Sequence, residues 1–241
     1  MLKKLMFAGF AVLSVIGISD VDCYADKRSF VWTYEYATML KDRMEVEVYS
    51  TTEIPDVGDM STSFWKWQVE LEYGITEKFD VAVYEMFKQK AGVLAAFEYE
   101  GFKVRTRYKL FEKNQLPVDI LLYAELERGI DLSKPAVLEG KIILARTEGP
   151  WYFAYNQIFE QELESTSATV HSYSSGAAYE LDNWLKVGFE LKGNYSSGKQ
   201  YFGPVISITV PMKFFLNSGL VKGLHAGSTE VQSRTIFGVL F

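Results

Sequence analysis

The sequence is poor in cysteine, histidine and proline, and it nearly lacks helical hydrophobic periodicity. Only one cysteine, two histidines and six prolines occur in 241 residues. Two histidines and one cysteine do not favour a zinc site, and no phosphate-binding glycine loop, nucleophile elbow or HExxH motif is present. We therefore expect no metal, no cofactor and no enzymatic activity.

Long hydrophobic runs are missing after residue 25, and so are linkers, low-complexity tracts and exact repeats. The formal net charge is −6, and there is no basic patch with interleaved aromatics. This balance gives no indication of nucleic-acid binding. The sequence predicts one domain over residues 26–241.

The N-terminus has the pattern of a secretory signal peptide. Lys3 and Lys4 precede the uncharged stretch Leu5–Ser19, and small residues stand at the −3 and −1 positions of a cleavage site after Ala25. Residues 1–25 are therefore predicted to be removed, together with the only cysteine. A membrane anchor is the alternative, but the stretch is shorter than the ~20 residues of a spanning helix. A lipoprotein signal at Cys23 is disfavoured by the aspartates before it.

What the chain has in abundance is strict alternation with period two, which is typical of β-strands. In "FWKWQVELEYG", Trp65, Trp67, Val69, Leu71 and Tyr73 alternate with polar residues. Twelve strands are predicted, at 44–53, 62–74, 79–89, 95–111, 117–129, 135–147, 150–162, 167–180, 183–195, 200–211, 213–224 and 229–241.

The segment Phe30–Thr38 also alternates, but a thirteenth strand would break the even number expected of a closed bacterial barrel. We therefore expect residues 26–43 to lie in the lumen or to pair irregularly. The connections between the twelve strands are alternately short and long. This pattern predicts an antiparallel up-and-down meander.

Alternation alone does not say which face meets water, since a soluble sandwich buries its apolar face and a membrane barrel exposes it to lipid. Strands longer than the globular mean favour the barrel. So do the aromatics at the short turns, which would form an interfacial girdle. The girdle is predicted to contain Tyr73, Phe79, Tyr108, Trp151, Tyr179, Trp184, Phe214 and Phe241; Phe111, Tyr152 and Phe215 also flank these turns.

The last strand ends on Phe241, with Phe237 and Val239 on the same face. This ending resembles the C-terminal signature of Gram-negative outer-membrane β-barrel proteins. The resemblance implies an all-β transmembrane β-barrel of about twelve strands in the bacterial outer membrane. It also implies lipid contact and recognition by the barrel-assembly machinery through the Phe241 strand. We expect a monomer, and a soluble periplasmic β-protein is the alternative.

The stretch "VWTYEYATMLKDRMEVEVY" is loosely similar to the start of a group of outer-membrane transporters that includes the phenol-degradation-pathway type. Asp42 stands near the place where that group has a turn glycine. The resemblance implies transport, and small solutes would be the partners.

The inward face of the barrel is the main functional candidate. We expect it to carry Lys66, Glu70, Glu72, Lys103, Arg105, Arg107, Lys109, Glu125, Glu127, Glu139, Lys141, Glu160, Lys186, Glu190, Lys192 and Arg234. These side chains either line a narrow channel for small solutes or fill a closed structural or surface-contact barrel as ion pairs. The sequence leaves both alternatives open.

The motif "VHSYSSG" suggests a rim lipid hydrolase, because outer-membrane phospholipases carry a His-x-Ser motif. Here Tyr173 follows two residues after His171, and the next serine is Ser174. Strand residues three apart point to opposite faces. A rim histidine beside an interfacial tyrosine is therefore the preferred interpretation.

Overall fold

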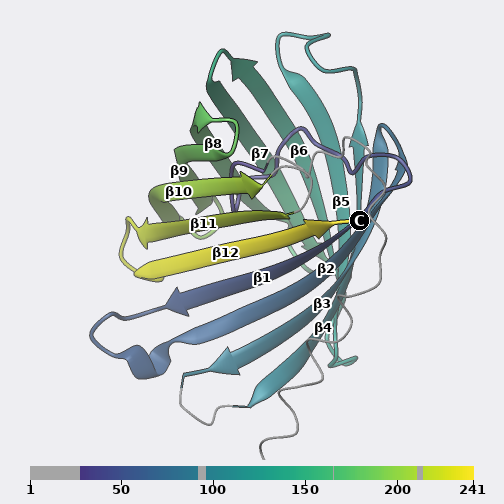
Figure 1. Cartoon of the computed structure of the whole chain (residues 1–241). Helices are drawn as coiled ribbons and strands as arrows, with labels where there is room; N and C mark the ends of the chain where they lie inside the picture. Colours follow the sequence, from purple (N-terminus) through teal and green to yellow (C-terminus); the bar gives the residue numbers. More distant parts are fainter. Residues whose placement is uncertain (1–27, 92–95, 165, 211–213) are drawn as a thin grey trace, which may run out of the picture.

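The computed structural model describes residues 28–91, 96–164, 166–210 and 214–241, in which twelve antiparallel strands form a closed barrel (Figure 1). Each strand pairs with its neighbours in the sequence, and the first pairs with the last. The predicted fold class, an up-and-down barrel of about twelve strands, is confirmed. The predicted signal peptide lies outside the described residues.

The strands agree with the predicted ranges to within a few residues at each end. They are β1 (Met44–Ile54), β2 (Phe64–Thr76), β3 (Phe79–Lys90), β4 (Phe97–Lys109), β5 (Asp119–Gly129), β6 (Val137–Glu148), β7 (Trp151–Glu162), β8 (Val170–Asp182), β9 (Leu185–Asn194), β10 (Gln200–Val210), β11 (Phe214–Gly223) and β12 (Val231–Leu240). One short 3-10 helix, η1 (Met60–Thr62), follows β1. No helix of the described residues is long and apolar enough to cross a membrane.

Outward positions along the strands are mainly apolar, and the inward positions carry most of the buried charges, together with apolar residues such as Leu121 and Phe215. On β2, Val69 and Leu71 are exposed, whereas Glu70 and Glu72 are 1% and 3% exposed. This is the reverse of a soluble sheet and matches the alternation of a membrane barrel, apolar outward and polar inward.

The two ends of the barrel differ in their connections. Short turns such as 77–78, 149–150 and 183–184 join strands at one end, which we call the short-turn end. Longer loops such as 55–63, 130–136 and 224–230 join them at the other, the long-loop end. The β4–β5 connection, 110–118, is longer than predicted. It contains Pro117, which cannot donate a hydrogen bond to a ladder, and β5 begins only after it.

The barrel closes where β12 pairs with β1, from Glu45 opposite Leu240 to Ile54 opposite Val231. Phe241 N donates to Met44 O at 2.8 Å, and Met44 N donates to Phe241 O at 3.3 Å. The last residue is therefore hydrogen-bonded into the wall.

Most of residues 28–43, which we call the lumen segment, lies inside the barrel (Figure 1, purple), and its last residues bridge to the wall, where Lys41 pairs with Gly74 of β2. The wall makes room for it with glycines. A Cβ on Gly176 of β8 would lie 2.3 Å from the Phe30 ring, and one on Gly74 of β2 would lie 2.0 Å from Leu40 O. Side chains at these two positions would displace the segment.

Candidate functional site in the barrel lumen

The predicted lining residues all occupy inward positions of their strands. They differ in how far they are buried: Arg105 and Glu190 are buried, whereas the Lys66 side chain at the long-loop end is 46% exposed. The inward positions are Lys66, Glu70 and Glu72 on β2; Lys103, Arg105, Arg107 and Lys109 on β4; Glu125 and Glu127 on β5; Glu139 and Lys141 on β6; Glu160 on β7; Lys186, Glu190 and Lys192 on β9; and Arg234 on β12.

On the wall formed by β2–β4, two arginines and three carboxylates form a buried network. Arg105 Nη2 lies 2.5 Å from Glu70 and 2.6 Å from Glu72. Arg107 Nη2 lies 2.7 Å from Asp80 and also contacts Glu72. All five side chains are at most 5% exposed. On this wall the charges fill the lumen as mutually paired ions, which is what buried charges require.

The neighbouring wall carries ion pairs that are less deeply buried. Lys103 Nζ lies 2.9 Å from both Glu125 and Glu127, and Lys141 Nζ lies 2.7 Å from Glu139. Glu127 is 40% exposed. This wall therefore combines paired charges with charges that face open space.

Glu190 holds the lumen segment at its centre. Its carboxylate accepts hydrogen bonds from the backbone N–H groups of Val31, Trp32 and Thr33, at 3.0, 2.9 and 2.8 Å. These donors have no backbone partner, since the segment forms no ladder there. Hydrogen bonds to an ionised acceptor are stronger than neutral ones, so one inward glutamate anchors three consecutive residues.

Other wall residues hold the segment on both sides. Asn156 accepts from Tyr34 N at 2.6 Å and donates to Tyr34 O at 2.9 Å. Asn217 donates to Arg28 O at 3.1 Å. Asp80 accepts from Met39 N at 2.8 Å. The segment is thus attached to β3, β7 and β11.

Arg28 adds an ion pair at the start of the segment. Its Nη1 lies 2.5 Å from Glu47 and donates to Tyr49 Oη at 2.8 Å. Burial by itself would lower the pKa of the Arg28 guanidinium, but Glu47 and Tyr49 raise it well above its usual value. Arg28 therefore stays charged and paired.

The segment is also packed by apolar contacts. Phe30 is fully buried and Val31 is 3% exposed, in one cluster with small and apolar inward residues of the wall. The rings of Phe30 and Tyr152 stack with their centroids 6.1 Å apart. The middle of the lumen is therefore a small hydrophobic core.

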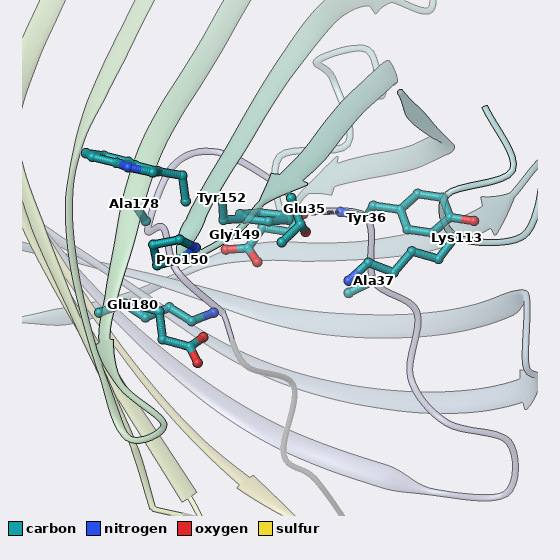
Figure 2. Close-up of a pocket in the computed structure, with 12 residues that line it drawn as sticks. Glu35, Tyr36, Ala37, Lys113, Gly149, Pro150, Tyr152, Ala178 and Glu180 are labelled. Atoms are coloured by element: carbon teal, nitrogen blue, oxygen red, sulfur yellow. Dashed lines mark hydrogen bonds between the residues drawn. The ribbon is translucent and has the colours of Figure 1, made fainter. Parts of the chain in front are cut away.

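A cavity of about 240 Å³ remains between the segment and the wall near the short-turn end (Figure 2). Glu35, Tyr36 and Ala37 of the segment form one side of it, and the turn at Gly149–Pro150 borders the other. Charged side chains line it as well, including Lys113, Glu180 and Lys186. The space has a mixed polar and apolar lining and lies on the short-turn side of the segment.

The predicted girdle aromatics lie on or beside the outer face near the short-turn end. Trp151 and Tyr179 contact each other edge to face at 5.0 Å, and Phe214 lies 5.8 Å from Phe237. Tyr73, Phe79, Tyr108, Trp184 and Phe241 are also outward and at least partly exposed. Tyr152 and Phe215 point inward instead, which corrects their prediction as turn aromatics of the girdle. Each directly follows an outward aromatic, and consecutive strand residues alternate faces.

His171 and Ser174 point to opposite faces of β8. The His171 ring contacts Phe159 at 5.3 Å outside the barrel, while Ser174 is 2% exposed on the inside. Ser174 Oγ lies 3.2 Å from Asn156 Oδ1. The two side chains therefore do not form a nucleophile–base pair in this arrangement.

Several lumen residues were not identified from the sequence, notably Glu47, Asp80, Asn156 and Asn217. Glu47 belongs to the alternating "MEVEVYS", and Asp80 to "FDVAVY". In both stretches the acidic residue alternates with apolar neighbours, so the alternation could have predicted that its side chain points into the lumen. Asn156 and Asn217 had no such signal, because neutral polar residues are common on either face.

No protein-family model and no curated protein sequence matches the chain. The similar solved structures are outer-membrane barrels. An outer membrane channel from Pseudomonas putida F1 has a TM-score of 0.61 at 11% identity, covering 88% of this chain and 100% of that one. The KdgM porin, solved in complex with disordered oligogalacturonate, has a TM-score of 0.55 at 12% identity, and the match covers 82% of this chain and 98% of that one. The NanC porin has a TM-score of 0.54 at 8% identity, and the match again covers 82% of this chain and 98% of that one. At these identities the likeness establishes the fold; the resemblance to the phenol-degradation type of transporter stays a prediction.

Proposed function

We propose that this chain is an outer-membrane channel for small solutes, with a lumen narrowed by residues 28–43. The observation that carries the proposal is that charged side chains remain accessible on both sides of this segment. Towards the long-loop end, Lys66, Glu127 and Lys192 remain partly exposed. Towards the short-turn end lies the 240 Å³ cavity. The lumen segment, with the ion pairs and apolar side chains packed around it, lies between the two.

The strand number supports a narrow bore. Eight-stranded barrels are filled by side chains, whereas sixteen-stranded porins leave an aqueous channel. Twelve strands lie between, so one inserted segment can control whether the lumen is open. The channel and porins among the similar structures support the same function by analogy of fold.

Single-channel conductance tests the proposal directly. Refolded protein comprising residues 26–241 would be inserted into a planar lipid bilayer. We expect small, discrete current steps. Folding would be established first by the heat-dependent shift in gel mobility. A folded barrel that gives no steps at any applied voltage would overturn the channel function.

A closed structural or surface-contact barrel is the second candidate, and the packing of the lumen segment favours it. Phe30 and Val31 are buried in the central cluster, and Glu190 holds the backbone beside them. Such packing would keep the lumen closed permanently. The same conductance measurement separates the two functions.

The outer membrane is the proposed location, reached after cleavage of the predicted signal peptide. We further propose that Phe241 and its strand are read by the barrel-assembly machinery, and that the protein is a monomer. Deleting Phe241 should reduce the amount of folded protein in the outer-membrane fraction of a Gram-negative host, while refolding of the purified chain continues. Unchanged amounts in the host would contradict recognition through Phe241.

A further inference from the structure

Two lumen cations, Lys192 and Arg234, have no acidic partner. No carboxylate of the described residues lies within 4.0 Å of either charged group. By contrast, each of several other inward cations is bridged to an acid, namely Lys66, Lys103, Arg105, Arg107 and Lys141. Both Lys192 and Arg234 are half-buried, and a charge removed from water needs a counter-charge.

The two cations converge on Trp32 of the lumen segment. Lys192 Nζ lies 4.8 Å from the centre of this ring and 5.2 Å from that of Tyr201. The Arg234 Cζ lies 5.8 Å from the centre of the Trp32 ring. Aromatic faces stabilise a cation only partly, so the two positive charges are left close together and incompletely compensated.

The other contacts of Arg234 hold its guanidinium in place, but they do not use all of its N–H donors. Nε donates to Thr51 Oγ1 at 2.9 Å, and Nη1 donates to Val31 O at 3.2 Å. Neither acceptor carries a charge. The guanidinium is thus positioned by neutral groups, and Nη2 makes no hydrogen bond to any part of the chain that the structure describes.

The acids nearest in the fold are already engaged. Glu190, on the same strand as Lys192, accepts three N–H groups of the lumen segment. Glu53 lies 3.0 Å from Lys66. Neither carboxylate lies within 4.0 Å of the Lys192 or Arg234 charge, so each compensates these cations only from a distance.

The opposite wall is acidic. Strand order places β6 across the barrel from β12, and the inward carboxylates of β5–β7 outnumber Lys103 and Lys141. Glu139 and Glu160 are directly opposed in the β6–β7 register. Both the acidic wall of β5–β7 and the wall that carries Lys192 and Arg234 have these charges towards the long-loop end. An anion entering there is repelled by the carboxylates of β5–β7 and attracted by Lys192 and Arg234. The carboxylates of the acidic wall are Glu125, Glu127, Glu139 and Glu160.

We propose that Lys192 and Arg234, positioned on Trp32, form an anion subsite for the carboxylate of a small organic acid. The planar guanidinium suits a carboxylate, and Lys192 adds a second positive charge. This subsite rests on the proposed channel function, because the solute must enter the lumen to reach it. Small organic acids are then the class of solute that would be held before passing the lumen segment.

The test is binding of succinate to the refolded barrel in detergent, measured by isothermal titration calorimetry. Succinamide has a similar shape without charge, and inorganic phosphate is the competing anion. Lys192→Gln and Arg234→Gln remove the two cations. Lys78→Gln is the control, because it removes a cation in the 77–78 turn, away from the subsite, whose acidic partner Glu112 lies 2.5 Å away.

We expect wild-type protein to bind succinate more tightly than succinamide or phosphate. Each subsite variant should weaken succinate binding by about tenfold or more, since each loses a charged hydrogen bond, and Lys78→Gln should not. Equal binding of succinamide, or no effect of the subsite variants, would overturn the subsite. Equally tight phosphate binding would overturn its assignment to carboxylates.

The binding measurement needs no bilayer, so the subsite and the channel can fail separately. Conducting protein that does not bind succinate would overturn the subsite and keep the channel. Protein that binds succinate but never conducts would keep the anion site and overturn its role in transport. Heat-dependent gel mobility of each variant shows that the barrel is folded.

Discussion

At the scale of single residues, the lumen contains two kinds of charge that contribute differently to stability. Arg105 is 0% exposed and lies between Glu70 and Glu72. Lys66 is 46% exposed and pairs with Glu53. A buried ion pair costs much when one partner is lost, because the remaining charge stays in a low-dielectric site. An exposed pair costs little.

Replacing Arg105 should therefore destabilise the barrel strongly. We expect Arg105→Met to lower the free energy of unfolding by about 3–5 kcal/mol, because Glu70 and Glu72 are left without their counter-charge. Lys66→Met should change it by at most ~1 kcal/mol. Urea unfolding in lipid vesicles, followed by tryptophan fluorescence, measures both. Similar values for the two variants would show that the Arg105 network is hydrated rather than buried.

Glu190 is the residue on which the lumen segment depends most directly. In Glu190→Gln the three N–H groups of Val31, Trp32 and Thr33 lose a charged acceptor, which is worth about 1.5–3 kcal/mol for such hydrogen bonds. The population with a released segment should rise by about tenfold or more. Trypsin cleavage after Arg28 should accelerate accordingly.

Glu160→Gln is the control for this experiment, since Glu160 is an inward carboxylate with no hydrogen bond to the segment among the described residues. Its cleavage rate should match that of wild-type protein. Equal acceleration in both variants would mean that general lumen charge, and not the Glu190 anchor, retains the segment.

At the scale of elements, the strands were predictable and the hold on the lumen segment was not. The inward and outward sets of β2 follow from alternation, which is a local property of the sequence. The segment alternates too, and only the even strand number of closed barrels set it apart. Its partners Glu190 and Asn217 lie more than 150 residues away in the sequence. Contacts at that separation leave no periodic signal.

Whether the segment must move for solutes to pass can be tested with a disulfide. A Cβ built on Gly219 would lie 2.6 Å from Val31 Cγ2, so the two Cβ positions are at most about 4 Å apart, within reach of a disulfide. The predicted mature chain contains no cysteine, so Val31→Cys with Gly219→Cys forms the only pair. We expect conductance of the oxidised protein to fall several-fold and to return on reduction.

Each single cysteine variant is the control for this lock and should not respond to oxidant. Conductance that is identical in the oxidised and reduced double variant, with the disulfide verified by mass spectrometry, would show that solutes pass beside a stationary segment. The 240 Å³ cavity at the short-turn end would then be part of the path.

At the scale of the whole molecule, the distribution of polar and apolar residues is inverted relative to a soluble protein. Exposed positions along the outer wall carry Leu122, Ile142 and Phe153, while the buried positions include glutamates and arginines. A closed barrel satisfies every strand without an edge. Such an apolar outer surface is favourable in contact with lipid. The free energy of unfolding should therefore depend on the membrane depth at which a charge is placed on the outer wall.

A charge on the outer wall at mid-strand should therefore be costly in lipid. Ile142 is near the centre of β6 and 41% exposed. We expect Ile142→Arg to destabilise the barrel in phosphatidylcholine vesicles by about 2–4 kcal/mol, the cost of arginine at the bilayer midplane. Leu132, in the 130–136 loop, is 75% exposed, and Leu132→Arg should stay within ~0.5 kcal/mol. Both values come from urea titration of vesicle-inserted protein. If Ile142→Arg proved as mild as Leu132→Arg, the outer face of β6 would not contact the hydrocarbon core, and the membrane-spanning orientation inferred from alternation would be wrong.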